Sequence, residues 1–306
     1  MNQPNLRGLI AAAVTPMNED HSIDEGSLRR YLHWIADQGV VGVAVNVDTG
    51  EGPHLFPEER LRVLRIALEE VGGRVTVVAG LAATFTEQAV RVAKETAALG
   101  VHAFLVFPIS VYQGEPLDPS IPADYHRAIA EASGLPLIAF QLQPALGGVN
   151  FSAEAVARIM EVDGVVAIKE ASFDAKRFLD VTRLVHDLPQ PKVVLNGNDN
   201  FLLEAYLLGA EGALLGFGTL ASREQVDMLE AVRSGDHPRA FEIGRRVQAL
   251  CDAIFAPPVR DYRARTKHAL ARLEVIDAPH VRPPLLPLSP EEAGAVDRAM
   301  KEAGLI

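Results

Sequence analysis

The run Val165-Val166-Ala167-Ile168-Lys169-Glu170-Ala171 carries four apolar residues directly into a lysine. A short apolar run of this kind is typical of a parallel-sheet strand that is buried on both faces. Side chains alternate along a strand, so Val165, Ala167 and Lys169 share one face. A buried ammonium is costly unless it is paired or loses its proton, and a neutral lysine attacks carbonyl groups. The alternative is a lysine that reaches solvent at the strand end or pairs with Glu170.

Seven further apolar runs precede and follow this one, with amphipathic helical segments between them. Eight strand–helix units within residues 1–221 predict a closed (β/α)8 TIM barrel. The alternative is a doubly wound open sheet, but Thr15-Pro16-Met17-Asn18 follows the first strand in place of a glycine-rich dinucleotide turn. The other predicted strands are Leu9–Val14, Gly42–Asn46, Thr76–Leu81, Ala103–Pro108, Leu137–Gln141, Val193–Asn196 and Ala213–Phe217.

From residue 222 onward the pattern is helical only. We therefore predict a barrel over residues 1–221 and a C-terminal helical extension over residues 222–306, packed on the barrel. No proline-rich or serine-rich linker separates the two parts. The apolar faces of the extension must pack on the barrel or on another subunit. Its predicted helices are Gln225–Val232, Pro238–Ile254, Tyr262–Leu273 and Glu291–Ala303.

Composition excludes several functional classes. The 306 residues carry a net charge of −11, which makes nucleic acid a poor partner. No apolar run approaches the roughly 18 residues of a membrane span, and residues 1–7 have no signal-peptide character. Cys251 is the only cysteine, which fits a reducing, cytoplasmic setting. The nine histidines show no ligand spacing, so we expect no metal and no other cofactor.

Active sites of such barrels form at the carboxyl ends of the strands, where Lys169 ends the sixth strand. The second strand runs into Asp48-Thr49-Gly50-Glu51, whose hydroxyl and amides either hold a small carboxylate or form an ordinary turn. Asp48 either pairs with the lysine, acts as general base or caps a helix. His54 and Tyr112 either donate protons or pack, and Asn196 either forms a turn or binds a ligand. Further candidate substrate-binding residues at the strand ends are Phe140, Gln141 and Gly216.

These motifs resemble the dihydrodipicolinate synthase / N-acetylneuraminate lyase family of Schiff-base barrels over roughly residues 6–275. Val165–Ser172 is similar to that family's Gly-Ile-Lys-Glu-Ala-Ser/Thr strand, and Asp48–Glu51 resembles its Gly-Thr-Thr-Gly-Glu turn. The resemblance implies that Lys169 forms the imine and that Thr49, with Gly50 beside it, holds the carboxylate of a 2-oxo acid. It also implies three C-terminal helices and a homotetramer built as a dimer of dimers.

The departures from this family are equally informative. The family's Tyr-Asn pair on strand 5 is Phe140-Gln141 here, and phenylalanine has no hydroxyl with which to transfer a proton. The family's relay threonine is replaced by Asp48. Residues 143–148, Gln-Pro-Ala-Leu-Gly-Gly, lack the arginine that the synthases use for their second substrate. We therefore expect neither dihydrodipicolinate synthase nor sialic acid lyase activity.

The sequence thus favours a Schiff-base lyase of aldolase or dehydratase type, acting on pyruvate or a related 2-oxo acid or sugar acid. Lys169 is the expected nucleophile and Asp48 the expected acid/base. The neutral amide of Gln141 suits a substrate hydroxyl better than a second carboxylate. Two alternatives remain: another reaction on the same lysine, such as isomerisation, decarboxylation or hydrolysis, and a non-catalytic protein that binds 2-oxo acids.

Overall fold

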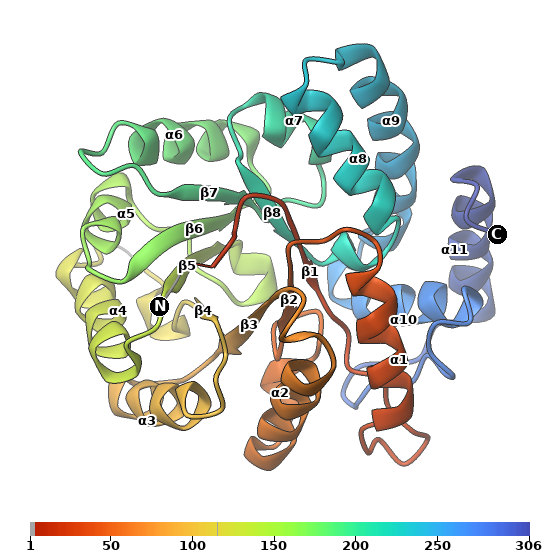
Figure 1. Cartoon of the computed structure of the whole chain (residues 1–306), viewed down its shortest axis with the longest axis horizontal. Coiled ribbons are helices and arrows are strands. Elements are labelled where there is room, and N and C mark those ends of the chain that lie inside the picture. The colour runs from red at the N-terminus through yellow and green to blue at the C-terminus, as the bar shows by residue number, and fades with distance from the viewer. Residues whose placement is uncertain (1–3, 115) are drawn as a thin grey trace.

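The computed structural model describes residues 4–114 and 116–306. Within them, parallel strands form a closed barrel in chain order, with β1 paired to β8, which confirms the predicted TIM barrel (Figure 1). The three strands expected at Thr76–Leu81, Val165–Ala171 and Val193–Asn196 have those bounds, and the others differ by one to two residues at their ends. The strands are β1 (Leu9–Ala12), β2 (Gly42–Val45), β3 (Thr76–Leu81), β4 (Ala103–Val106), β5 (Leu137–Leu142), β6 (Val165–Ala171), β7 (Val193–Asn196) and β8 (Gly212–Leu215).

Helices cover the outside of the barrel and alternate with its strands (Figure 1). They are α1 (Glu25–Ala36), α2 (Pro57–Val71), α3 (Thr86–Ala97), α4 (Ser120–Ser133), α5 (Ala153–Met160), α6 (Ala175–His186), α7 (Leu202–Leu207) and α8 (Ser222–Arg233). Short 3-10 turns follow several strands, at η1 (Gly52–His54), η2 (Ser110–Tyr112), η3 (Pro144–Leu146) and η4 (Phe217–Thr219).

Alternation along each strand divides the apolar residues into two cores. Ile138, Phe140 and Leu195 belong to the core inside the barrel. Ile168 and Val194 belong to the core between the sheet and the surrounding helices. Val165 lies in that outer core too, so the expectation that it shares a face with Lys169 is wrong, because the register with β5 shifts at the start of β6. In the register of β5, β6 and β7, Lys169 lies beside Phe140 and Leu195 and therefore faces the barrel interior.

The helical extension begins later than the sequence analysis placed it. Helix α8 packs on β1 and completes the eighth strand–helix unit, so we assign residues 222–233 to the barrel. The extension then comprises α9 (His237–Ile254), η5 (Val259–Asp261), α10 (Tyr262–Arg272) and α11 (Pro290–Glu302), and α11 packs against both α9 and α10. Figure 1 shows these helices together at one side of the barrel, near α8 and α1. In the described ranges, no helix is both long and apolar enough to cross a membrane.

Candidate active site

Lys169 is buried at the carboxyl end of β6, with 8% of its surface exposed. Its ammonium nitrogen lies 4.2 Å from the centroid of the Phe140 ring, a cation–π distance. In the described part of the chain Lys169 forms no ion pair, and the neighbouring Glu170 points to the opposite face of the strand. The alternative of a solvent-exposed lysine, or one paired with Glu170, is therefore wrong.

Asp199, which follows β7, is the carboxylate most strongly linked to this lysine. Burial lowers the pKa of Lys169 to about 8, although the charges of Asp199 and, less strongly, Asp48 raise it. Burial likewise raises the pKa of Asp199 to about 7, while the amide of Phe217 and the charge of Lys169 lower it. Asp199 Oδ1 accepts a hydrogen bond from Phe217 N at 3.0 Å, which fixes its carboxyl group. Burial thus brings the pKa values of Lys169 and Asp199 close to each other.

The backbone around Asp199 is held by the extension and leaves room for the lysine. Gln248 Nε2 and Cys251 Sγ of α9 both donate to the carbonyl of Asp199, at 3.0 Å each. A Cβ atom at Gly197 would lie only 2.7 Å from Lys169 Cε, so a glycine is needed there for the lysine to take its place.

The turn after β2 supplies a carboxylate-sized site. Thr15 Oγ1 donates to the carbonyl of Gly50 at 2.8 Å and ties the turn to the end of β1. A Cβ at Gly50 would lie 2.7 Å from the carbonyl of Ala13, so only glycine fits. Among the described residues, neither the amide of Thr49 nor that of Gly50 donates a hydrogen bond. Both remain able to bind an anion.

Two residues of α10 hold Asp48 in this turn. Arg263 Nη2 lies 2.5 Å from Asp48 Oδ1, and Arg263 Nε donates to the Asp48 carbonyl at 2.8 Å. The hydroxyl of Tyr262 donates to Asp48 Oδ2 at 2.8 Å and lies 3.3 Å from Thr49 Oγ1. The side chains of both Arg263 and Asp48 are mostly buried, with 10% and 18% exposed, so the ion pair is well shielded from water.

The ring of Tyr262 is held in place by Phe255 and by the backbone at Gly216. Phe255 stacks on it with a centroid distance of 4.6 Å and an interplanar angle of 18°. Gly216, directly after β8, lies against both rings, since a Cβ there would be 3.0 Å from Phe255 Cζ, 3.1 Å from Thr49 Oγ1 and 3.2 Å from Tyr262 Cε2. The structure therefore places Gly216 beside Thr49.

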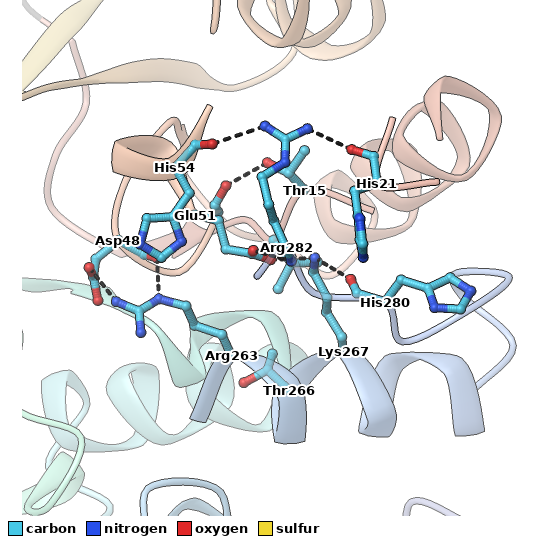
Figure 2. Close-up of polar contacts among 12 residues, drawn as sticks. Thr15, His21, Asp48, Glu51, His54, Arg263, Thr266, Lys267, His280 and Arg282 are labelled. Carbon is cyan, nitrogen blue, oxygen red and sulfur yellow. Dashed lines mark hydrogen bonds and ion pairs between the residues drawn. The ribbon is translucent and has the colours of Figure 1, made fainter. Parts of the chain in front are cut away.

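Below the turn, Glu51 is bound to α10 and to the chain that follows it (Figure 2). Lys267 donates to Glu51 Oε1 and, at 2.7 Å, to the carbonyl of His280. The amide of Arg282 donates to Glu51 Oε2 at 2.9 Å. Glu51 has a φ of 55°, a left-handed conformation that costs a non-glycine residue energy, and these contacts hold it there.

Two predicted substrate-binding residues, Gln141 and Asn196, face away from Lys169. In the strand register both lie beside Glu170, on the face opposite the lysine, because side chains alternate. Gln141 Nε2 donates to Glu170 Oε1 at 2.8 Å, and Asn196 bonds Asn198. Both amides are thus occupied in a buried polar layer between sheet and helices, and we correct their placement.

Tyr112 also lies apart from the lysine. Its ring contacts Tyr125 and Phe151 at centroid distances of 6.2 and 6.3 Å, in the core outside the barrel. His54 Nδ1 is buried without a partner in the described ranges, and the His54 carbonyl accepts a hydrogen bond from Arg282.

A concavity of about 1610 Å³, lined by His102 among others, lies at the amino ends of the strands, the end opposite Lys169. No set of metal-ligating side chains occurs among the residues described.

Sequence reasoning missed three residues of the site. Asp199 follows β7 and so shares the position of the other strand-end candidates, but the sequence does not distinguish it from a turn residue. Tyr262 and Arg263 begin α10, far from the turn in sequence. No local pattern points from that helix to Asp48, so only the tertiary fold brings these groups together.

Comparison with known proteins agrees with this geometry. The profile of the dihydrodipicolinate synthetase family matches residues 5–303. The chain belongs to this family. It is 33% identical over 302 residues to 4-hydroxy-tetrahydrodipicolinate synthase of Thiobacillus denitrificans, with 98% of each chain covered. The family identified from the lysine strand and the Asp48–Glu51 turn is therefore confirmed.

Solved structures of the family share the fold along the whole chain. Dihydrodipicolinate synthase of Thermotoga maritima superposes with a TM-score of 0.90 at 26% identity, covering 98% of this chain and 99% of that one. The Acinetobacter baumannii synthase, crystallised with pyruvate, gives 0.87 at 29% identity, with 99% and 100% covered. N-acetylneuraminate lyase of Fusobacterium nucleatum gives 0.84 at 26% identity, with 97% and 98% covered.

Proposed function

We propose that this protein is a class I lyase whose Lys169 forms an imine with pyruvate or a related 2-oxo acid, in an aldolase or dehydratase reaction. The family is one of Schiff-base, aldolase-type lyases. The observation that carries the proposal is the buried, unpaired lysine at the carboxyl end of β6, with its pKa lowered by burial to about 8. A lysine of this kind is partly neutral near physiological pH and therefore nucleophilic.

The remaining groups have distinct tasks in this proposal. Thr49 and the free amides of Thr49 and Gly50 bind the carboxylate, which places the neighbouring carbonyl carbon toward Lys169. Asp199 favours the charged form of Lys169, because its own charge raises the pKa of the lysine. The cationic imine then stabilises the carbanion formed when a carbon–carbon bond breaks, or assists loss of water.

We further propose that dihydrodipicolinate synthesis is not its reaction, although relatives carry the name 4-hydroxy-tetrahydrodipicolinate synthase. Phe140 occupies the strand 5 position beside Lys169, where a proton-transferring tyrosine is expected. Residues 143–148 contain no arginine for a second carboxylate. The homotetramer remains part of the proposal on the strength of the family resemblance, and sedimentation velocity of the purified protein tests it.

Reductive trapping tests the proposed chemistry. The purified protein is incubated with borohydride and pyruvate, 2-oxobutyrate or 2-oxoglutarate, then digested and weighed. One reduced 2-oxo acid should be found on Lys169, and Lys169→Ala should remove it. Lys192→Ala, at the amino ends of the strands, is the matched control and should keep the adduct. An adduct on another lysine, or none with any of the three acids, would disprove the proposal.

A further inference from the structure

The strand 5 position beside Lys169 supplies no hydroxyl group for proton transfer. Phe140 occupies that position, and its ring faces the ammonium of Lys169 at 4.2 Å. Tyr112 is buried among aromatic rings outside the barrel. Imine chemistry on a 2-oxo acid nevertheless needs a group that gives a proton to the departing oxygen.

Tyr262 of α10 places a hydroxyl group at the turn after β2. It lies 2.8 Å from Asp48 Oδ2 and 3.3 Å from Thr49 Oγ1, at the turn proposed to bind the carboxylate. Asp48 also raises the pKa of Lys169 through its charge, so turn and lysine share one electrostatic environment. Stacking on Phe255 and the absence of a side chain at Gly216 fix the ring in this orientation.

The charges around this hydroxyl assign different tasks to Asp48 and Tyr262. Asp48 is ion-paired with Arg263, whose Nε and Nη1 donate to the carbonyls of Asp48 and Arg260. Protonating Asp48 would leave a buried guanidinium unpaired, which is unfavourable. Burial, and then the charge of Asp48, raises the pKa of Tyr262 well above its ordinary value, so the phenol is protonated at rest.

We propose that Tyr262, delivered by the C-terminal helix α10, is the proton-transferring hydroxyl of this site, in place of a strand 5 tyrosine and of Asp48. This inference rests on the proposed imine chemistry at Lys169. Asp48 and Arg263 position the hydroxyl and do not themselves transfer protons.

In the proposed sequence of steps, Tyr262 first gives up a proton and then regains one. The Lys169 amine adds to the carbonyl carbon, and a proton moves from nitrogen to oxygen to give a carbinolamine. Tyr262 gives its proton to that hydroxyl, which leaves as water while the nitrogen lone pair forms the C=N bond. The phenolate then takes a proton from C3; the C–H pair forms the C2=C3 bond and the C=N pair returns to nitrogen. The result is an enamine and a neutral Tyr262.

Exchange of the pyruvate methyl protons in D2O isolates this step, since it needs no second substrate. The exchange rate is measured by proton NMR and divided by the fraction of Lys169 that borohydride traps. The trapped fraction is measured after the imine has reached equilibrium with pyruvate, so lost folding or lost binding lowers both quantities, whereas lost proton transfer lowers only the exchange rate. Tyr262→Phe keeps the stacked ring and should reduce the normalised rate by about a hundredfold or more, the scale of a lost general acid/base.

Tyr206→Phe is the matched control, because Tyr206 is a buried tyrosine on α7 whose hydroxyl has no partner among the described residues. It should leave the normalised rate within about threefold of wild type, since it removes no proton-transferring group. A Tyr262→Phe rate within that range, an equal fall in both variants, or a wild-type adduct without exchange would overturn the inference. Absence of any wild-type adduct would instead remove the proposed function on which it rests.

Discussion

Glu51 and Lys267 form an ion pair in which neither side chain is exposed to solvent. The pair joins the turn after β2 to α10, and the amide of Arg282 and the carbonyl of His280 satisfy further hydrogen bonds of the two groups. A buried pair of this kind contributes little net stability over apolar residues, but loss of one partner is costly. Its main effect is therefore to fix where the turn lies.

This pair predicts strongly coupled substitutions. Lys267→Met leaves Glu51 as a buried, uncompensated carboxylate and should lower the free energy of unfolding by about 3–5 kcal/mol. Lys267→Met combined with Glu51→Gln should be more stable than the sum of the single changes, as judged by denaturant unfolding. The exposed Lys176–Asp180 pair is the control, and Lys176→Ala should change stability by no more than about 0.5 kcal/mol. Strict additivity of the Glu51 and Lys267 changes would contradict this account.

The pH dependence of imine formation follows from the pKa of Lys169. Because burial lowers that pKa to about 8 and only the neutral amine attacks, the rate of borohydride trapping should rise with pH to a plateau, with a midpoint near 8. Asp199 raises the pKa of the lysine, so Asp199→Asn should move the midpoint to lower pH. If Asp199 also exchanges protons, the plateau falls as well. An unchanged midpoint would show that Asp199 does not act on Lys169.

Asp48→Asn separates anchoring from proton transfer. Asparagine still accepts a hydrogen bond from Tyr262, but it removes a charge that raises the pKa of Lys169. The midpoint of trapping should therefore move to lower pH, while the normalised exchange rate falls less than in Tyr262→Phe. A loss of about a hundredfold or more in Asp48→Asn alone would return the acid/base role to Asp48.

Gly216→Ala tests whether the positions of Tyr262 and Thr49 depend on the absence of a side chain at residue 216. The backbone of Gly216 has a φ of −62°, which alanine adopts readily, so any effect is steric. The added Cβ would meet Phe255 Cζ, Thr49 Oγ1 and Tyr262 Cε2 at 3.0 to 3.2 Å. We expect weaker 2-oxo acid trapping and slower exchange, with a stability loss of about 1–3 kcal/mol. If Gly216→Ala traps 2-oxo acids and exchanges protons at the wild-type rates, the reaction does not require Tyr262 and Thr49 to hold these positions.

The absence of an arginine from residues 143–148 predicts which second substrate the protein does not use. Aspartate semialdehyde and pyruvate together should give little or no cyclic product in a coupled assay, because residues 143–148 offer no cation to the second carboxylate. Pyruvate trapping on Lys169 in the same preparation serves as the control for folded protein. Robust turnover would show that another cation of the chain binds this substrate.

The barrel was predictable because its signals are local. Each strand is a short apolar run, and β3, β6 and β7 have the bounds that the sequence predicts. Strand ends were less predictable: Val14 and Pro108 continue the apolar pattern although the ladder stops earlier. Helix α8 was assigned to the extension because periodicity reports a helix but not the strand on which it packs.

The site was predictable only where it follows the strands. Lys169 was found because an ammonium ends an apolar run. Gln141 and Asn196 were misplaced because position at a strand end was weighed without the alternation that fixes the face. Tyr262 and Arg263 could not be found, since their contacts with Asp48 span 214 and 215 residues of chain.

Those long spans have a consequence for protein synthesis. The ribosome completes β8 and α8 before it adds Tyr262, Arg263 and Lys267, the side chains that hold the turn after β2. A nascent or truncated chain that stops at residue 233 possesses Lys169 and every barrel strand, but none of these anchors. Under the proposed mechanism we therefore expect a product that stops at residue 233 to lack lyase activity, although it contains Lys169 and every barrel strand.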